Sequence, residues 1–148
     1  MGTSRWAILA TFSVLLALPG PAATQSAVVD ATLYRALGER AGLERLMNDF
    51  VPRLKADPRI AEHFKETKLS HLAKQLTDQL CVVAGGPCVY DGASMKDAHA
   101  DLKVRRADFN ALVEQLQRSM DAQAIPFSVQ NRLLALLAPM HRDVINTR

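Results

Sequence analysis

The chain has 148 residues and a formal net charge of +3, and this length is enough for one domain. Its basic residues are scattered rather than clustered, so they indicate solvated helix faces and exclude nucleic acid as a partner. No stretch shows sustained alternation of apolar and polar residues, so the sequence excludes a β fold and predicts an all-α domain.

Residues 1–26 have the layout of a secretory signal peptide. Arg5 supplies a positive start, residues 6–18 are almost wholly apolar, and Pro19-Gly20-Pro21 breaks this run before two alanines. The run is too short for a comfortable membrane span, and the alternative is an uncleaved N-terminal anchor. We expect cleavage between Gly20 and Ala27, export to the bacterial periplasm without stable membrane insertion, and a domain over residues 30–148.

The rest of the chain predicts successive helices, each with one apolar stripe. A short helix over residues 32–37 ends at Gly38. In the next helix Pro52 removes one backbone hydrogen bond, which predicts a kink near Val51. A short turn then starts at Asp57 and leads to Phe64. The stripe of the second helix consists of Leu43, Leu46, Met47, Phe50 and Leu54.

The following helix is predicted to end abruptly at Gly85-Gly86-Pro87. A long helix near residues 109–120 has Asp108 as its expected cap. The last helix spans about residues 128–145, and Pro139 inside it predicts a bend. The stripe before the glycine pair consists of Leu69, Leu72, Leu76, Leu80 and Val83.

A histidine stands on a short helix between these elements. Ser94 and Asp97 have the spacing of a capping box that starts this helix. His99 shares a helical face with Met95, one turn earlier, and with Leu102. An imidazole on the apolar side of a short helix is either a packed core residue or a metal ligand.

The chain contains two cysteines, Cys81 and Cys88. An exported protein meets an oxidising compartment, where a disulfide is permitted. We expect the two to be joined, closing a small loop around the glycine pair. The alternative is a buried thiol at Cys81 and an unrelated loop thiol at Cys88.

Ordered motifs over residues 33–145 support a family resemblance. The most specific block runs from Gly85-Gly86-Pro87 through Tyr90-x-Gly92 to Met95-x-x-Ala98-His99. The supporting motifs are Leu33-Tyr34-x-x-Leu37-Gly38, Phe50, Ala56-Asp57-Pro58, Phe64, Leu72, Phe109 and Leu137-Ala138-Pro139. In this order the chain resembles the truncated haemoglobins, and group I in particular.

The resemblance implies a two-over-two helical sandwich around a non-covalent haem b. Covalent attachment of the c type would need Cys-x-x-Cys-His, which is absent. By resemblance His99 is the proximal iron ligand, and Phe64 packs against the haem. The implied haem pocket consists of Phe50, Val51, Phe64, Leu72, Leu76, Leu80, Tyr90, Met95 and His99.

The distal side departs from the family pattern. Val51 stands where the family usually has tyrosine, and Leu76 stands where glutamine is common. With Leu72 these side chains offer no hydrogen bond, so we expect weak dioxygen binding and fast release. Gln75, Gln79 or His71 could instead reach in and restore a donor. The candidates for pairing with a haem propionate are Lys68, His71 and Lys74, and the alternative for each is a solvated surface position.

The expected function is therefore reversible binding of dioxygen and other diatomic ligands, CO and NO, at an iron held by His99. We expect an oxygen-binding or transport protein rather than an enzyme, and a monomer or weak dimer. One alternative is a haem enzyme for nitric oxide dioxygenation. The alternative of another class is a haem-free helical interaction domain.

Overall fold

The computed structural model describes residues 30–147. The predicted signal peptide lies outside the described residues. Within residues 30–147 all regular structure is helical, as the sequence predicts. None of the described helices has the length and apolar character needed to cross a membrane. The helices are α1 (Thr32–Ala36), α2 (Glu39–Ala56), η1 (Ala61–Phe64), α3 (Leu69–Val83), α4 (Met95–His99), α5 (Arg106–Ala122), α6 (Phe127–Leu137), η2 (Ala138–Met140) and α7 (His141–Val144).

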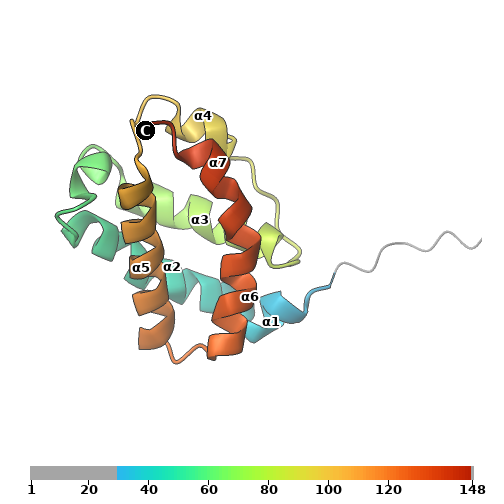
Figure 1. The fold of residues 1–148 in the computed structure, drawn as a ribbon. Helices are drawn as coiled ribbons and strands as arrows, with labels where there is room; N and C mark the ends of the chain where they lie inside the picture. The colour runs from blue at the N-terminus through green and yellow to red at the C-terminus, as the bar shows by residue number, and fades with distance from the viewer. Residues whose placement is uncertain (1–29, 148) are drawn as a thin grey trace, which may run out of the picture.

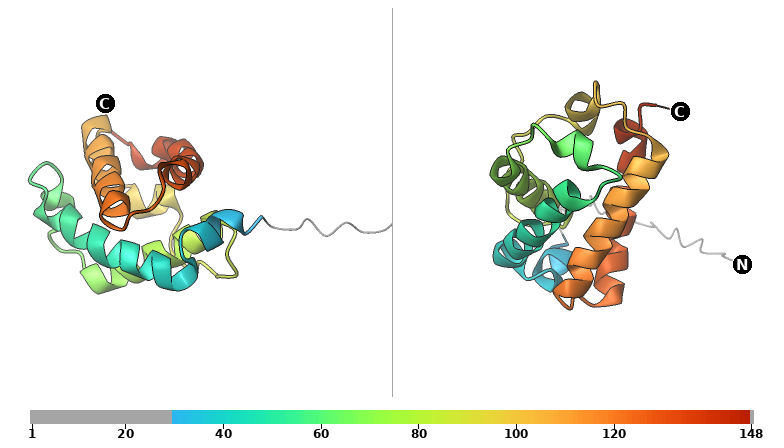
Figure 2. Two further views of the ribbon diagram at one scale, coloured as in Figure 1. Left: turned by 90° about the horizontal axis from the view of Figure 1, so that it is seen from below. Right: turned by 90° about the vertical axis from the view of Figure 1, so that its left-hand side faces the viewer.

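The long helices form two layers. α2 and α3 pack side by side in one layer, and α5 with α6 lies across them in the other (Figure 1). Seen from below, the α5 and α6 pair sits over the α2 and α3 pair (Figure 2). α4 packs against α7 at one end of the sandwich. The arrangement therefore matches the predicted two-over-two sandwich.

α2 supplies the centre of the core, because it packs against α3 in its own layer and against α5 in the other. The predicted stripe is fully buried together with Val51. Pro52 lies inside α2, on the exposed side, and the helix continues for one more turn to Ala56. Gly38 precedes α2 with a φ of 81°, a conformation that costs glycine little and lets the chain turn sharply from α1 into α2.

The C-terminal helix is more interrupted than the sequence predicts. One bent helix over residues 128–145 is expected, but the structure divides this stretch into α6, η2 and α7. Pro139 lies in η2, where its missing N–H removes an α-helical hydrogen bond and the backbone tightens into a 3-10 turn. The break turns α7 toward α4.

The start of α5 also differs from the prediction. Asp108 is not the N-cap; the helix begins at Arg106, and Asp108 is the third helical residue. Its carboxylate accepts hydrogen bonds from the backbone N–H of Arg105 at 2.9 Å and from the Arg105 guanidinium at 3.0 and 3.1 Å. These bonds lower the pKa of Asp108 from 3.8 to about 2. Asp108 thus caps the helix from its first turn.

Cys81 and Cys88 form a disulfide, with their Cα atoms 5.9 Å apart. Cys81 belongs to the last turn of α3 and is fully buried, whereas Cys88 lies in the loop toward α4. Gly86 passes so close to this bridge that a Cβ there would lie 2.5 Å from the Cys81 Sγ and 2.6 Å from the Tyr34 ring. The bridge therefore holds the loop against α3, and the absence of a side chain at Gly86 lets the loop pass close to Tyr34 of α1.

Replacing Asp108 with alanine should destabilise the fold by about 1 kcal/mol at neutral pH, because the first turn of α5 loses its cap. The carboxylate has a depressed pKa in the folded state, so its contribution is present above 3.8 and is lost as the pH falls through about 2. Urea unfolding at several pH values measures the difference. Asp101→Ala, which removes an exposed carboxylate, is the control. Equal stability of Asp108→Ala and wild type at neutral pH contradicts the capping role.

Replacing Cys88 with alanine should lower stability by about 2 kcal/mol, because the unfolded chain gains the freedom that the bridge removes. Wild-type protein kept in a reductant should unfold like the variant. Thiol titration of denatured, unreduced wild type provides the direct measurement, and two free thiols there would contradict the bridge.

Candidate functional site

His99 sits at the end of a helix whose start is fixed by its own sequence. The Ser94 Oγ accepts a hydrogen bond from the Asp97 backbone N–H at 3.1 Å and donates one to the Asp97 carboxylate at 2.6 Å. The predicted cap is therefore present. Leu102, however, does not share a helical face with His99, because α4 ends at His99 and Leu102 lies beyond it, 40% exposed.

The His99 imidazole is oriented by its own helix. Its Nδ1 lies 2.7 Å from the backbone oxygen of Met95. A carbonyl oxygen can only accept, so Nδ1 carries the proton and Nε2 keeps its lone pair. This is the arrangement that holds a neutral imidazole ready to bind a metal.

Asn146 fixes the same end of α4 from a distant part of the chain. Its side-chain Nδ2 donates to the backbone oxygen of His99, and it lies 3.1 Å from the backbone oxygen of Ala100. The backbone N–H groups of Asn146 and Thr147 both donate to Val104 at 3.1 Å. No sequence motif singles out Asn146, because the contact joins residues 47 positions apart.

The predicted pocket residues fall into two sets. Phe50, Val51 and Leu80 are fully buried in the core. A second set of apolar residues is only partly buried, and it consists of Phe64, Leu72, Leu76 and Met95. Apolar side chains left partly exposed beside a packed core fit a flat apolar group such as haem.

Two glutamines on α3 have unusual surroundings. Gln79 is 9% exposed, and its Nε2 donates to the Met95 Sδ at 3.3 Å, with the Met140 Sδ at 4.0 Å. The Gln75 Oε1 is buried with no hydrogen-bond partner. The Gln79 N–H thus lacks a strong acceptor, and the Gln75 Oε1 lacks a donor. Such groups are rare among the buried polar atoms of proteins.

Tyr90 organises the loop that leads to α4. Its hydroxyl donates to the backbone oxygen of Ala93 at 2.9 Å, and burial raises the pKa of this phenol. A Cβ at Gly92 would lie 2.4 Å from the Tyr90 hydroxyl and 2.5 Å from the Gln75 Oε1. Glycine is therefore required for the loop to close over both side chains.

The three propionate candidates differ in their surroundings. Lys74 forms an ion pair with Asp78 at 2.8 Å, and Asp78 also pairs with Arg40 at 2.9 Å. The hydrogen bond to Asp78 raises the pKa of Lys74. Lys68 and His71 are exposed at the start of α3. Lys74 is therefore already bound to a carboxylate, and the structure brings no side chain to Lys68 or His71 by a hydrogen bond or ion pair among the described residues.

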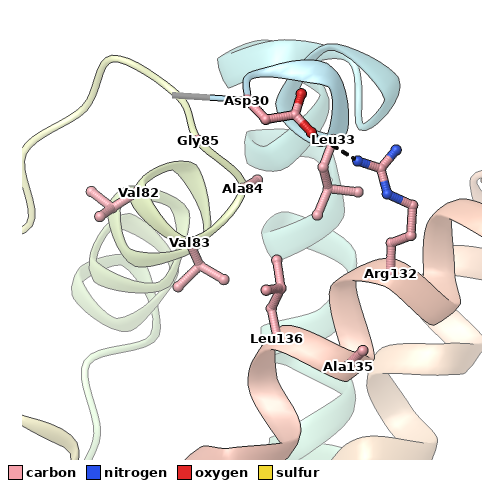
Figure 3. Close-up of a pocket in the computed structure, with 9 residues that line it drawn as sticks. All are labelled: Asp30, Leu33, Val82, Val83, Ala84, Gly85, Arg132, Ala135 and Leu136. Atoms are coloured by element: carbon pink, nitrogen blue, oxygen red, sulfur yellow. Dashed lines mark ion pairs between the residues drawn. The ribbon is translucent and has the colours of Figure 1, made fainter. Parts of the chain in front are cut away.

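Two surface hollows lie elsewhere. One of about 500 Å³ lies between α1, the end of α3 and α6, where Arg132 pairs with Asp30 at 3.7 Å (Figure 3). The other, of about 450 Å³, is lined by α1 and the glycine-pair turn. Neither includes His99 or Gln79 in its lining, so both are separate from the candidate site.

Comparison with known proteins places this geometry in a family. The Bacterial-like globin family model matches residues 32–146. The group 1 truncated haemoglobin of Tetrahymena thermophila is 33% identical over 77% of this chain and 94% of its own length. The group 1 truncated haemoglobin of Synechocystis is 30% identical over 78% of this chain and 98% of its own length.

Solved structures agree with the sequence comparison. The truncated haemoglobin of Tetrahymena pyriformis in its Fe(III) form superposes with a TM-score of 0.75 and 27% identity, covering 78% of this chain and 98% of that one. A 2/2 haemoglobin from Synechococcus with covalently attached haem shares the fold, with a TM-score of 0.73 and 23% identity over 77% of this chain and 98% of that one. Family model, relatives and fold agree over the same residues, and the chain belongs to the truncated haemoglobins of group 1, within the bacterial-like globin family.

Proposed function

We propose that the protein binds haem b non-covalently through His99 and reversibly binds dioxygen, CO and NO. The observation that carries this proposal is the hydrogen bond from the His99 Nδ1 to the Met95 backbone oxygen, which leaves Nε2 available for iron. The chain's membership of a haem-binding globin family supports the cofactor. When bound, the haem would supply an iron atom that accepts a small diatomic ligand.

The chain's own residues define the setting of that iron. His99 would hold the iron through the Nε2 of a neutral imidazole, and Asn146 restrains the backbone that carries it. Phe64, Leu72 and Leu76, which pack against the core, would give the bound group an apolar setting that disfavours water. The exposed Lys68 and His71 are placed at the start of α3 and suit contacts with propionates at the rim.

The pairing of the two cysteines supports non-covalent attachment. Cys81 and Cys88 are joined to each other, so neither offers a thiol for a thioether bond. Extraction into acidic organic solvent should therefore remove the haem completely. Haem that stays with the protein would contradict the b-type assignment.

A binding role fits these residues better than peroxide chemistry. Efficient cleavage of a peroxide needs an acid or base poised on the distal side. Val51, Leu72 and Leu76 supply none. Nitric oxide dioxygenation needs no such group, so rapid mixing of the oxygenated protein with nitric oxide distinguishes a carrier from a dioxygenase.

We also propose that the protein is exported to the periplasm, as residues 1–26 indicate. The Cys81–Cys88 bridge supports an oxidising compartment. Expression of the full chain in a bacterium should give a periplasmic product shortened by roughly 20 to 26 residues. Full-length protein in the membrane fraction would instead indicate an uncleaved anchor.

Replacing His99 with alanine should abolish or greatly weaken haem retention, because the proximal bond is lost. The matched control is His141→Ala, since the His141 Nδ1 also lies 2.8 Å from a backbone oxygen, that of Ala138. The Soret absorption per mole of purified protein provides the measurement. A normal haem content with an unchanged ferrous spectrum in His99→Ala shows that His99 is not the ligand.

A further inference from the structure

The segment that leads into α4 is tied to the rest of the protein at one residue. Residues 87–93 run from the glycine pair to the start of α4 (Figure 1). Among the described residues, the only disulfide or hydrogen bond that joins this segment to another part of the chain is at Cys88. Its Sγ forms the bridge to Cys81, and the Arg40 Nη1 donates to the same sulfur at 3.5 Å.

The other contacts of this segment hold it less firmly. The backbone hydrogen bonds of the preceding turn end at Gly86, whose N–H donates back into the last turn of α3 at 2.7 Å. The Tyr90 hydroxyl bonds within the segment, to the backbone oxygen of Ala93. Gly92 lies against the Gln75 Oε1, which forms no hydrogen bond. The bridge is therefore the one strong attachment of residues 87–93.

The position of α4 depends on this attachment at one end. α4 has no buried residue, and it packs against α7. Asn146 binds the backbone at its C-terminal end, whereas its N-terminal end continues directly from residues 87–93. Opening the bridge therefore frees the start of α4 while its end stays attached. The His99 imidazole, which is bonded to the backbone of Met95 at that start, then loses its fixed direction.

The two sulfurs of the bridge differ in accessibility, because Cys81 is fully buried and Cys88 is partly exposed. A thiolate of a dithiol reductant can therefore attack the Cys88 Sγ. A new S–S bond forms there, the bond to Cys81 breaks, and the Cys81 sulfur keeps the electron pair and takes up a proton. The second thiol of the reductant then displaces Cys88 as a thiol, and the reductant leaves as a disulfide. The protein gains two electrons and two protons, which the dithiol loses.

We propose that the Cys81–Cys88 bridge is a redox switch that controls how firmly haem is held at His99. This inference rests on the proposed function. In the oxidised protein the bridge fixes residues 87–93 and the start of α4, so His99 is held in position for iron. In the dithiol form α4 is held only at its far end, and haem is released faster. Firm retention of haem is thereby confined to an oxidising compartment, in keeping with the proposed export.

The test measures transfer of haem from the loaded protein to an excess of apomyoglobin, with and without dithiothreitol. Transfer should be about tenfold faster or more from reduced wild type, and reoxidation should restore the slow rate. Cys88→Ala should transfer haem at the fast rate whether or not the dithiol is present. This variant also controls for any effect of the dithiol on the iron.

A second variant separates the switch from a general loss of stability. Gln130 is buried and donates to Asp121 at 2.8 Å and to the backbone oxygen of Ile125 at 2.9 Å. These bonds lie at the turn between α5 and α6, at the opposite end of the sandwich from α4 (Figure 1). Gln130→Ala should lower the free energy of unfolding but keep the slow transfer of oxidised wild type.

Amide hydrogen exchange gives a readout that does not depend on haem transfer. Reduction should speed the exchange of residues 95–99 and leave the amides of α2 unchanged, because only the start of α4 is released. A bridge that contributes to global stability alone predicts faster exchange in both helices, and that result would overturn the inference.

Equal haem transfer from oxidised and reduced wild type also overturns the inference, as does equally fast transfer from oxidised Gln130→Ala. These results leave the proposed function intact, since loaded wild type still shows its Soret band. Wild-type protein that takes up no haem contradicts the proposed function itself, and the inference falls with it.

Discussion

The placement of His99 depends on one constraint, the reversal of the chain between α3 and α4. The eleven residues from Ala84 to Ser94 must leave the end of one layer and bring a five-residue helix back across it. A turn this short has little freedom, and three features hold it. The disulfide joins it to α3, Gly86 lets it press against Cys81 and Tyr34, and Tyr90 closes it onto Ala93. Because α4 has no buried residue of its own, its position is fixed by this loop and by its packing against α7.

A sequence can predict most of this fold because its signals are local. Helical spacing identifies the buried stripe of α2, and the Ser94 and Asp97 pair identifies the start of α4. These features depend on residues within one or two turns of each other. Asp108 shows the limit of such signals. An aspartate at this position predicts the N-cap, but α5 begins two residues earlier, and the Asp108 carboxylate reaches back to accept from the backbone N–H of Arg105.

The remaining features depend on contacts between distant segments. Pro139 predicts a disturbance, but whether a helix bends or breaks depends on what its second half packs against, here α4. Gln79 lies among leucines, and only the positions of Met95 and Met140 show that its amide points inward and lacks a strong acceptor. Lys74 and Asp78 are one helical turn apart, but only the fold brings Arg40 to the same carboxylate. Long-range geometry therefore decides which polar residues are available to a ligand.

Asn146 joins the end of α4, which carries His99, to the C-terminal segment of the chain. Because its amide binds the backbone oxygens of His99 and Ala100, a displacement of this end of α4 is transmitted to residues 146 and 147 as well. Val104, which accepts from both of those backbone amides, belongs to the same linkage. The side-chain NH₂ resonances of Asn146 therefore report on displacements of the end of α4. A protein fused to the C-terminus would therefore pull on the segment that holds the His99 backbone.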